Sequence, residues 1–198
     1  ADYFDDLLER IREIRTSERR YYQKVTDIYS ECSVDYDKNS EVTLAFFKTV
    51  QNIMHYAVSG QTAAEIVYHR SDAERPHMGL TTWKNAPNGR VIKSDVTVAK
   101  NYLSEKEVEE LNLLTTQYLD YAELQAKNHV LMTMSDWKRA LNRFLEFNQL
   151  EVLIDKGTIS HQQAEEKAVA EYEKFRIIQD REIMSDFDQQ LKLLLNGR

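Results

Sequence analysis

The sequence predicts a mostly α-helical protein: a multi-helix bundle with a long N-terminal helix and one small β-hairpin near residues 82–93. Charged residues make up 30% of the 198 residues and are interspersed with apolar residues at helical spacing. Five glycines and two prolines leave few turns for an all-β protein. A chain of this length can bury a core without disulfides. We therefore expect one helical domain, residues 34–198, forming one globular unit with the helix of residues 1–33.

The first element is predicted as one helix from Tyr3 to about Ser33, with Glu18 as the one break in its apolar spacing. Its apolar positions are Phe4, Leu7, Ile11, Ile14, Tyr21, Val25 and Ile28. This seam is close to a heptad pattern over four repeats. Packing on the protein's own core is the simpler interpretation, and we favour it. The same seam also predicts a homodimer through the N-terminal helix.

Capping residues mark the later helices. Ser40 is the expected N-cap of a helix from Glu41 to about Val58, with Leu44 and Phe47 among its inward residues. "SEKE" (104–107), Ser135 and "SHQQ" (160–163) mark three further starts. The last amphipathic stretch places four large apolar residues on one side: Met184, Phe187, Leu191 and Leu194.

An Asn-Gly pair lies between short β-capable flanks in "WKNAPNGRVIK", residues 83–93. Asn-Gly is the preferred pair for the primed turns that close two-residue hairpins. This pair is the basis of the predicted hairpin.

Charge and cysteine content restrict the partners and the compartment. The net charge of −7 argues against a segment that grips phosphate backbones as a whole. A single cysteine, Cys32, excludes an internal disulfide and fits a reducing compartment, so we expect a cytoplasmic protein.

We find no export leader and no apolar run of membrane-spanning length, and we expect no membrane contact. No cofactor is predicted.

The stretch "GQTAAEIVYHRSDAERPHMGLTTWK", residues 60–84, is the most unusual part of the chain. From residue 69 to residue 101, six Lys/Arg oppose three acidic residues in an otherwise acidic chain. On a helix beginning near residue 61, Glu65 and His69 share one face, and the first N–H groups offer a place for a phosphate. The candidate ligand or partner site comprises His55, Gly60, Thr62, Glu65, His69, Arg70, Asp72, Lys84, Lys93, Lys100, Asp120 and Glu123.

A structural interpretation of the same stretch is simpler, and we favour it. Thr62 would only cap the helix, and Arg70 would be partly buried and paired with Asp72 or Glu65, because an unpaired buried guanidinium is costly. Apolar anchors would hold an ordered loop on the domain, namely Met78, Leu80 and Trp83.

Asp120 and Glu123 are spaced to share one helix face. With His55 or His69 they could hold a metal, but nothing in the spacing requires one. A salt bridge, for example to Lys93 or Lys100, is the more common role of such a pair. We predict no metal.

Three long blocks carry a family resemblance: "YFDDLLERIREIRTSERRYYQKVTDIYSECSVDYD", "FFKTVQNIMHYAVSGQTAAEIVYHRSDAERPHMGLTTWK" and "KSDVTVAKNYLSEKEVEELNLLTTQYLDYAELQA". The chain resembles the RhuM family of bacterial virulence-associated proteins. His77 and Arg75 stand where the family usually shows Asn and Lys. The resemblance implies a helix-turn-helix-like domain that precedes this region and contacts DNA in its place.

Our leading hypothesis is a helical regulatory or interaction domain of a DNA-associated RhuM-like protein, not a catalyst. The alternative is a nucleotide- or nucleic-acid-acting enzyme, or a sensor of a phosphate ligand, that uses the basic region of residues 60–101. Residues 55–63 are similar to the Fic/Doc motif only at His55 and Gly60. Its Phe, acidic, Asn and Arg positions are here Ala57, Ser59, Gln61 and Ala63.

Overall fold

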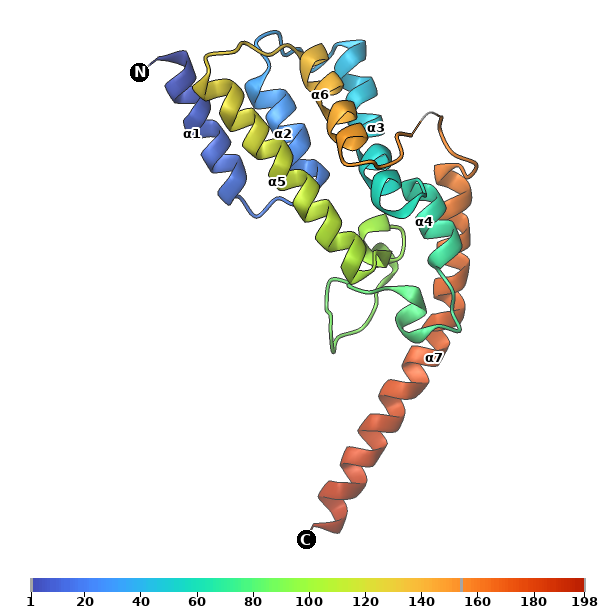
Figure 1. Ribbon diagram of the computed structural model, residues 1–198. Helices are drawn as coiled ribbons and strands as arrows, with labels where there is room; N and C mark the ends of the chain where they lie inside the picture. Colours follow the sequence, from blue (N-terminus) through green and yellow to red (C-terminus); the bar gives the residue numbers. More distant parts are fainter. Residues whose placement is uncertain (1, 154, 198) are drawn as a thin grey trace. The chain divides into compact units, whose positions relative to one another are not determined.

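The computed structural model describes residues 2–153 and 155–197. In these ranges the chain forms seven α-helices and three short 3-10 turns, with no β-strand (Figure 1). The elements are α1 (Tyr3–Thr16), α2 (Tyr22–Cys32), α3 (Glu41–Ser59), α4 (Ala63–Arg70), η1 (Pro76–Gly79), η2 (Lys93–Asp95), η3 (Ala99–Tyr102), α5 (Glu105–Lys127), α6 (Met134–Phe147) and α7 (His161–Asn196). The mostly helical prediction is confirmed, and its β-hairpin is wrong.

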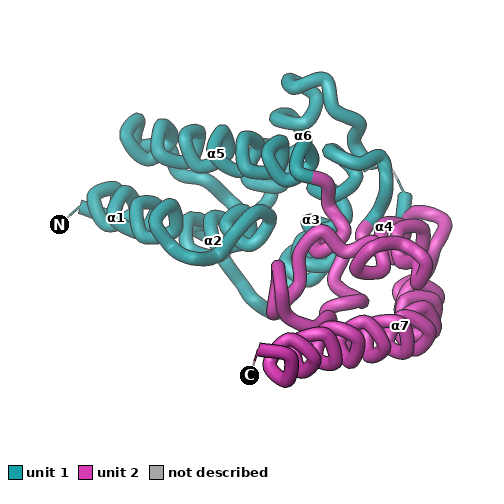
Figure 2. The backbone as a smooth tube through the Cα atoms, turned by 90° about the horizontal axis from the view of Figure 1, so that it is seen from below, with its two compact units in different colours: residues 1–62, 105–156 teal, residues 63–104, 157–198 magenta. Residues whose placement is uncertain are grey.

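The chain forms two compact units, each made of two separate stretches (Figure 2). Unit 1 comprises residues 1–62 and 105–156, and unit 2 comprises residues 63–104 and 157–198. The boundaries between the units fall after residues 62, 104 and 156. The first helical stretch belongs to the body of unit 1.

The expected helix of residues 3–33 is interrupted and forms α1 and α2. Ser17 adopts extended backbone angles, and its hydroxyl donates to the Ile14 carbonyl at 2.8 Å, which ends α1. Tyr21, at φ 53°, is the N-cap residue that precedes α2. Serine and threonine compete with the helix for backbone hydrogen bonds. The apolar pattern had only one sign of this break, Glu18.

Unit 1 buries the apolar seam of its first two helices. Leu7, Ile11 and Ile14 of α1 are buried, and α1 packs on α2 and α5. Packing of this seam on the protein's own core, the interpretation we favoured, is therefore confirmed. The rings of Tyr29 and Phe46 stack at 4.1 Å between centroids, joining α2 to α3.

Two details of helix α3 test the local predictions. Ser40 accepts a hydrogen bond from the Thr43 N–H at 3.1 Å, so it is the N-cap as expected. At the start of α3 the inward face is one position away from the expected one, because Phe46 is fully buried while Leu44 and Phe47 are 50% and 39% exposed.

The predicted hairpin of residues 82–93 is a series of turns. The Trp83 indole is buried and donates to the Gly89 carbonyl at 2.9 Å. The Asp95 carboxylate accepts from the N–H groups of Lys84 and Ile92 at 3.0 and 2.8 Å. Side chains thus take backbone groups that strand pairing would have used, and the two flanks do not form a ladder.

Helix α7 is the support on which unit 2 is built. Side chains of α7 bind the backbone of the irregular segment, residues 71–91, at three points. Lys167 donates to the Ser71 carbonyl, and Glu171 accepts from the Ala73 N–H at 2.9 Å. Gln179 binds both backbone groups of Val91, at 2.9 and 3.1 Å. Buried backbone groups outside regular structure need such partners. The predicted anchors Met78, Leu80 and Trp83 are all buried, which confirms an ordered loop.

Candidate functional site

The predicted site residues are divided between the two units. Five belong to unit 1: His55, Gly60, Thr62, Asp120 and Glu123. Seven belong to unit 2: Glu65, His69, Arg70, Asp72, Lys84, Lys93 and Lys100.

In unit 1, the residues near the end of α3 have local structural contacts. His55 is fully buried, with Nδ1 2.7 Å from the Gln51 carbonyl and its ring 5.8 Å from that of Tyr22. Gly60 ends α3 in the left-handed conformation at φ 69°, the common role of glycine at a helix C-terminus. Thr62 is buried. His55 and Gly60 therefore each have a local structural role at α3.

Asp120 and Glu123 both contact one guanidinium. Arg15 Nη2 lies 2.9 Å from Asp120 Oδ1 and 3.0 Å from Glu123 Oε2. Lys127 Nζ lies 2.8 Å from the other Glu123 oxygen. The carboxylate pair therefore forms an ion-pair network between α1 and α5, with cations other than the expected Lys93 or Lys100. In residues 2–153 and 155–197 no three His, Cys, Asp or Glu side chains are grouped to hold a metal.

This network predicts a pH-dependent contribution of Glu123 to stability. The hydrogen-bonded Lys127 ammonium, followed by Arg15, lowers the pKa of Glu123. A lowered folded-state pKa stabilises the fold above the unfolded-state pKa, and that contribution is lost as pH falls through the folded-state value. The loss of unfolding free energy caused by Glu123→Gln should therefore shrink between about pH 6 and about pH 3. Urea unfolding across this range measures it.

Glu109→Gln on the exposed side of α5 is the matched control and should show a smaller pH dependence. A Glu123→Gln effect that stays constant over the whole range would contradict the ion-pair assignment.

In unit 2, the residues of the basic stretch differ in their contacts and in their exposure. Arg70 is partly buried, as expected, and its Nη1 donates to the Tyr102 carbonyl at 3.0 Å. Asp72 forms an ion pair with Arg75 at 3.5 Å. Lys84 and Lys93 are exposed, and Lys100 is partly exposed in η3.

A cavity of about 670 Å³ lies within unit 2 between the loops and α7. Its lining mixes the basic Arg75 and Arg90 with the acidic Glu74, Glu182 and Asp186. This balance gives no strong preference for an anion. No local sequence pattern marks the cavity, because its two walls are about a hundred residues apart in the chain.

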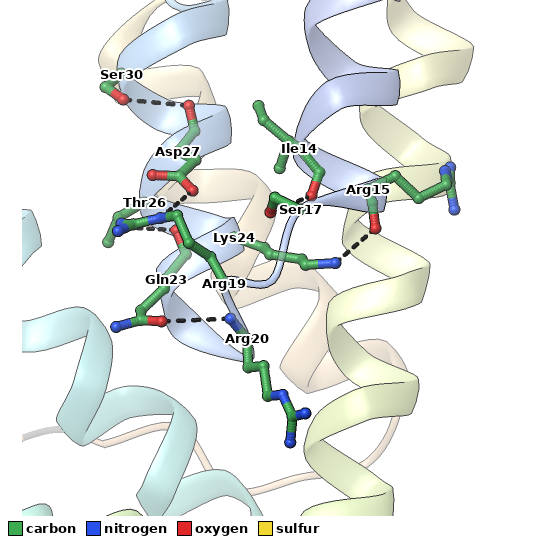
Figure 3. A network of polar contacts seen from close by, with 10 residues as sticks. All are labelled: Ile14, Arg15, Ser17, Arg19, Arg20, Gln23, Lys24, Thr26, Asp27 and Ser30. Carbon is green, nitrogen blue, oxygen red and sulfur yellow. Dashed lines mark hydrogen bonds and ion pairs between the residues drawn. The ribbon is translucent and has the colours of Figure 1, made fainter.

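A second concave region, of about 640 Å³, lies within unit 1 at the break between α1 and α2. Arg19 pairs with Asp27 at 2.6 Å, and Lys24 donates to the Arg15 carbonyl at 2.6 Å. Figure 3 shows the Arg20 guanidinium directed away from the other labelled side chains. Most of these groups hold the shape of the break, so we assign no ligand to this region.

The largest unexplained feature is an apolar face on the C-terminal half of α7. Every described residue of α7 after Gln179 is exposed, and Figure 1 shows this half running beyond the other elements of unit 2. We call its exposed heptad residues the α7 stripe: Ile177, Met184, Phe187, Leu191 and Leu194, which are 53%, 58%, 57%, 44% and 74% exposed. Monomeric proteins rarely leave such a contiguous row uncovered. The stripe is therefore the candidate functional site.

Within residues 2–153 and 155–197 the regular structure is entirely helical, and α7 exposes an apolar face. A model of the Virulence protein RhuM family matches residues 1–184, and the chain belongs to this family. Searches among curated proteins and among solved structures found no match. In the described ranges, no helix combines the length and apolar character needed to cross a membrane.

Proposed function

We propose that this chain is a self-assembly domain that associates with a second copy through the α7 stripe. The observation that carries the proposal is the row of five large exposed apolar residues, four of which lie beyond Gln179, the last buried residue of α7. Burying one such side chain fully contributes about 1.5–3 kcal/mol to the free energy of association. Leaving the row exposed to water is therefore unfavourable. A second copy brings an identical stripe and covers both at once.

The seam of the first helix is less suited to this role. Its residues Leu7, Ile11 and Ile14 are already buried inside unit 1. A dimer through the N-terminal helix would have to open that core or use another face. We therefore assign association to α7.

Assembly would allow the domain to regulate DNA binding. The resemblance to RhuM proteins implies a helix-turn-helix-like DNA-binding module, and pairing two chains would present two such modules to related half-sites. We place this activity in the cytoplasm. The location fits the single thiol, Cys32, which is buried and whose pKa is raised by burial to about 12.

Charging the stripe tests the proposal. Phe187→Glu combined with Leu191→Glu should abolish concentration-dependent association, because four buried charges would replace four apolar contacts in a dimer. Light scattering and sedimentation equilibrium of the full chain measure the mass. Thermal stability of the monomer should change little, since both side chains are exposed.

Leu113→Glu on α5 is the matched control, because Leu113 is 58% exposed but lies outside the stripe. This control should associate like the natural chain. A natural chain that stays monomeric at every concentration would refute the proposed function.

A further inference from the structure

We propose that two copies of the chain pair through their α7 stripes in antiparallel orientation, about a two-fold axis between residues 185 and 186. This inference rests on the proposed function and adds the geometry of the partner. It depends on the charges that flank the stripe.

The stripe follows a heptad in which the core positions are 177, 180, 184, 187, 191 and 194. Five of these six positions are apolar, and the sixth is Asp180. Each heptad has two core positions, its first and its fourth residue. In an antiparallel pair, a residue at the first position of one helix faces a residue at the fourth position of the other. The facing pairs are then 177 with 194, 180 with 191, and 184 with 187, each occurring twice. The seam spans 18 residues, or about 27 Å of helix.

Asp180 distinguishes the two orientations. In a parallel pair the two Asp180 carboxylates would face each other in one core layer, and like charges at a core layer disfavour pairing. In the antiparallel pair Asp180 faces Leu191 of the second copy. Its carboxylate keeps the ion pair that it forms with Arg90 inside unit 2.

The flanking charges favour the same orientation. Arg181 and Asp188 occupy equivalent positions beside the seam, one heptad apart. In the antiparallel pair Arg181 of each copy lies beside Asp188 of the other, giving two ion pairs. In the parallel pair Arg181 would instead lie beside Arg176. Within residues 2–153 and 155–197 neither Arg181 nor Asp188 has an ion-pair partner of its own.

The charge balance of this half-helix disfavours a lipid surface as the occupant. Residues 176–197 contain four acids and three bases. Helices that lie on anionic membranes carry a polar face rich in lysine and arginine. A second copy matches both the apolar row and its flanking charges.

Cysteine cross-linking of the full chain reads the orientation directly. Ile177→Cys and Leu194→Cys proteins are prepared separately, then mixed and oxidised. The mixture should form a covalent dimer containing one of each chain, because positions 177 and 194 face each other. Each protein alone should form little covalent dimer, since identical positions lie about 25 Å apart, far beyond disulfide reach. Buried Cys32 stays out of the reaction.

A charge exchange provides the second test. Arg181→Asp alone and Asp188→Arg alone should each weaken association, by up to about tenfold, because two attractive pairs become repulsive. The double variant Arg181→Asp/Asp188→Arg should associate like the natural chain. A parallel pair predicts no such recovery.

Efficient covalent dimers of Leu194→Cys alone, or no recovery in the double variant, would overturn the antiparallel geometry while leaving self-assembly through α7 intact. A natural chain that never associates would instead overturn the proposed function itself. The two failures are therefore distinguishable.

Discussion

Replacing Gly79 by Ala is expected to lower the free energy of unfolding of unit 2 by about 2–6 kcal/mol. Gly79 adopts φ 91°, which L-residues rarely occupy. An added Cβ would lie 2.1 Å from the carbonyl oxygen of Arg70. The end of α4 and the loop must separate to remove this overlap. That movement would disturb the Asp72 N–H bond to the Met78 carbonyl, 3.1 Å in the native loop.

Hydrogen–deuterium exchange measures this effect locally, because faster exchange is expected in residues 71–103 and not in unit 1. Gly60→Ala is the matched control. Gly60 has a similar φ of 69°, but no atom lies within 4 Å of an added Cβ. Gly60→Ala should lower the free energy of unfolding by only about 1 kcal/mol, the cost of placing alanine in the left-handed conformation. Equal losses at both glycines would contradict the close approach of Gly79 to α4.

Replacing Gln179 by Leu is expected to destabilise unit 2 by about 2–5 kcal/mol, although leucine is apolar and similar in size. The Gln179 amide accepts from the Val91 N–H and donates to the Val91 carbonyl, and both residues are buried. Leucine would leave both backbone groups without a partner, and each orphaned group costs about 1–3 kcal/mol. The exchange rate of the Val91 amide and chemical unfolding report this loss.

Gln189→Leu gives the control on the same helix. Gln189 is exposed, so its replacement should change stability by no more than about 0.5 kcal/mol. If the Val91 amide stays protected from hydrogen exchange in Gln179→Leu, the hydrogen bonds between Val91 and Gln179 do not hold the loop on α7.

The features predicted correctly from sequence are those decided by neighbouring residues. Ser40 and Ser160 cap their helices as expected, because a capping bond joins residues three apart in the chain. At α6 the cap is Thr133 rather than Ser135, a shift of two residues. The side-by-side placement of Met184, Phe187, Leu191 and Leu194 follows from helical periodicity alone.

The candidate site of residues 55–123 depended on contacts that no local pattern reveals. Asp120 and Glu123 have the spacing of a ligand pair, and only folding places both on Arg15, about a hundred residues earlier. A carboxylate pair on a helix has the same sequence pattern whether its partner is a metal, water or a guanidinium.

The sequence by itself determined the helical class, the starts of α3 and α7 and the apolar row of α7, because these depend on spacing within one or two turns. Tertiary structure decided that residues 82–93 form turns and that the chain divides into two discontinuous units. Val91 illustrates the reason: its backbone bonds go to Gln179, 88 residues away, instead of to a neighbouring strand. The free energy of satisfying a buried peptide group then outweighs the local preference of Asn88 and Gly89 for a hairpin turn.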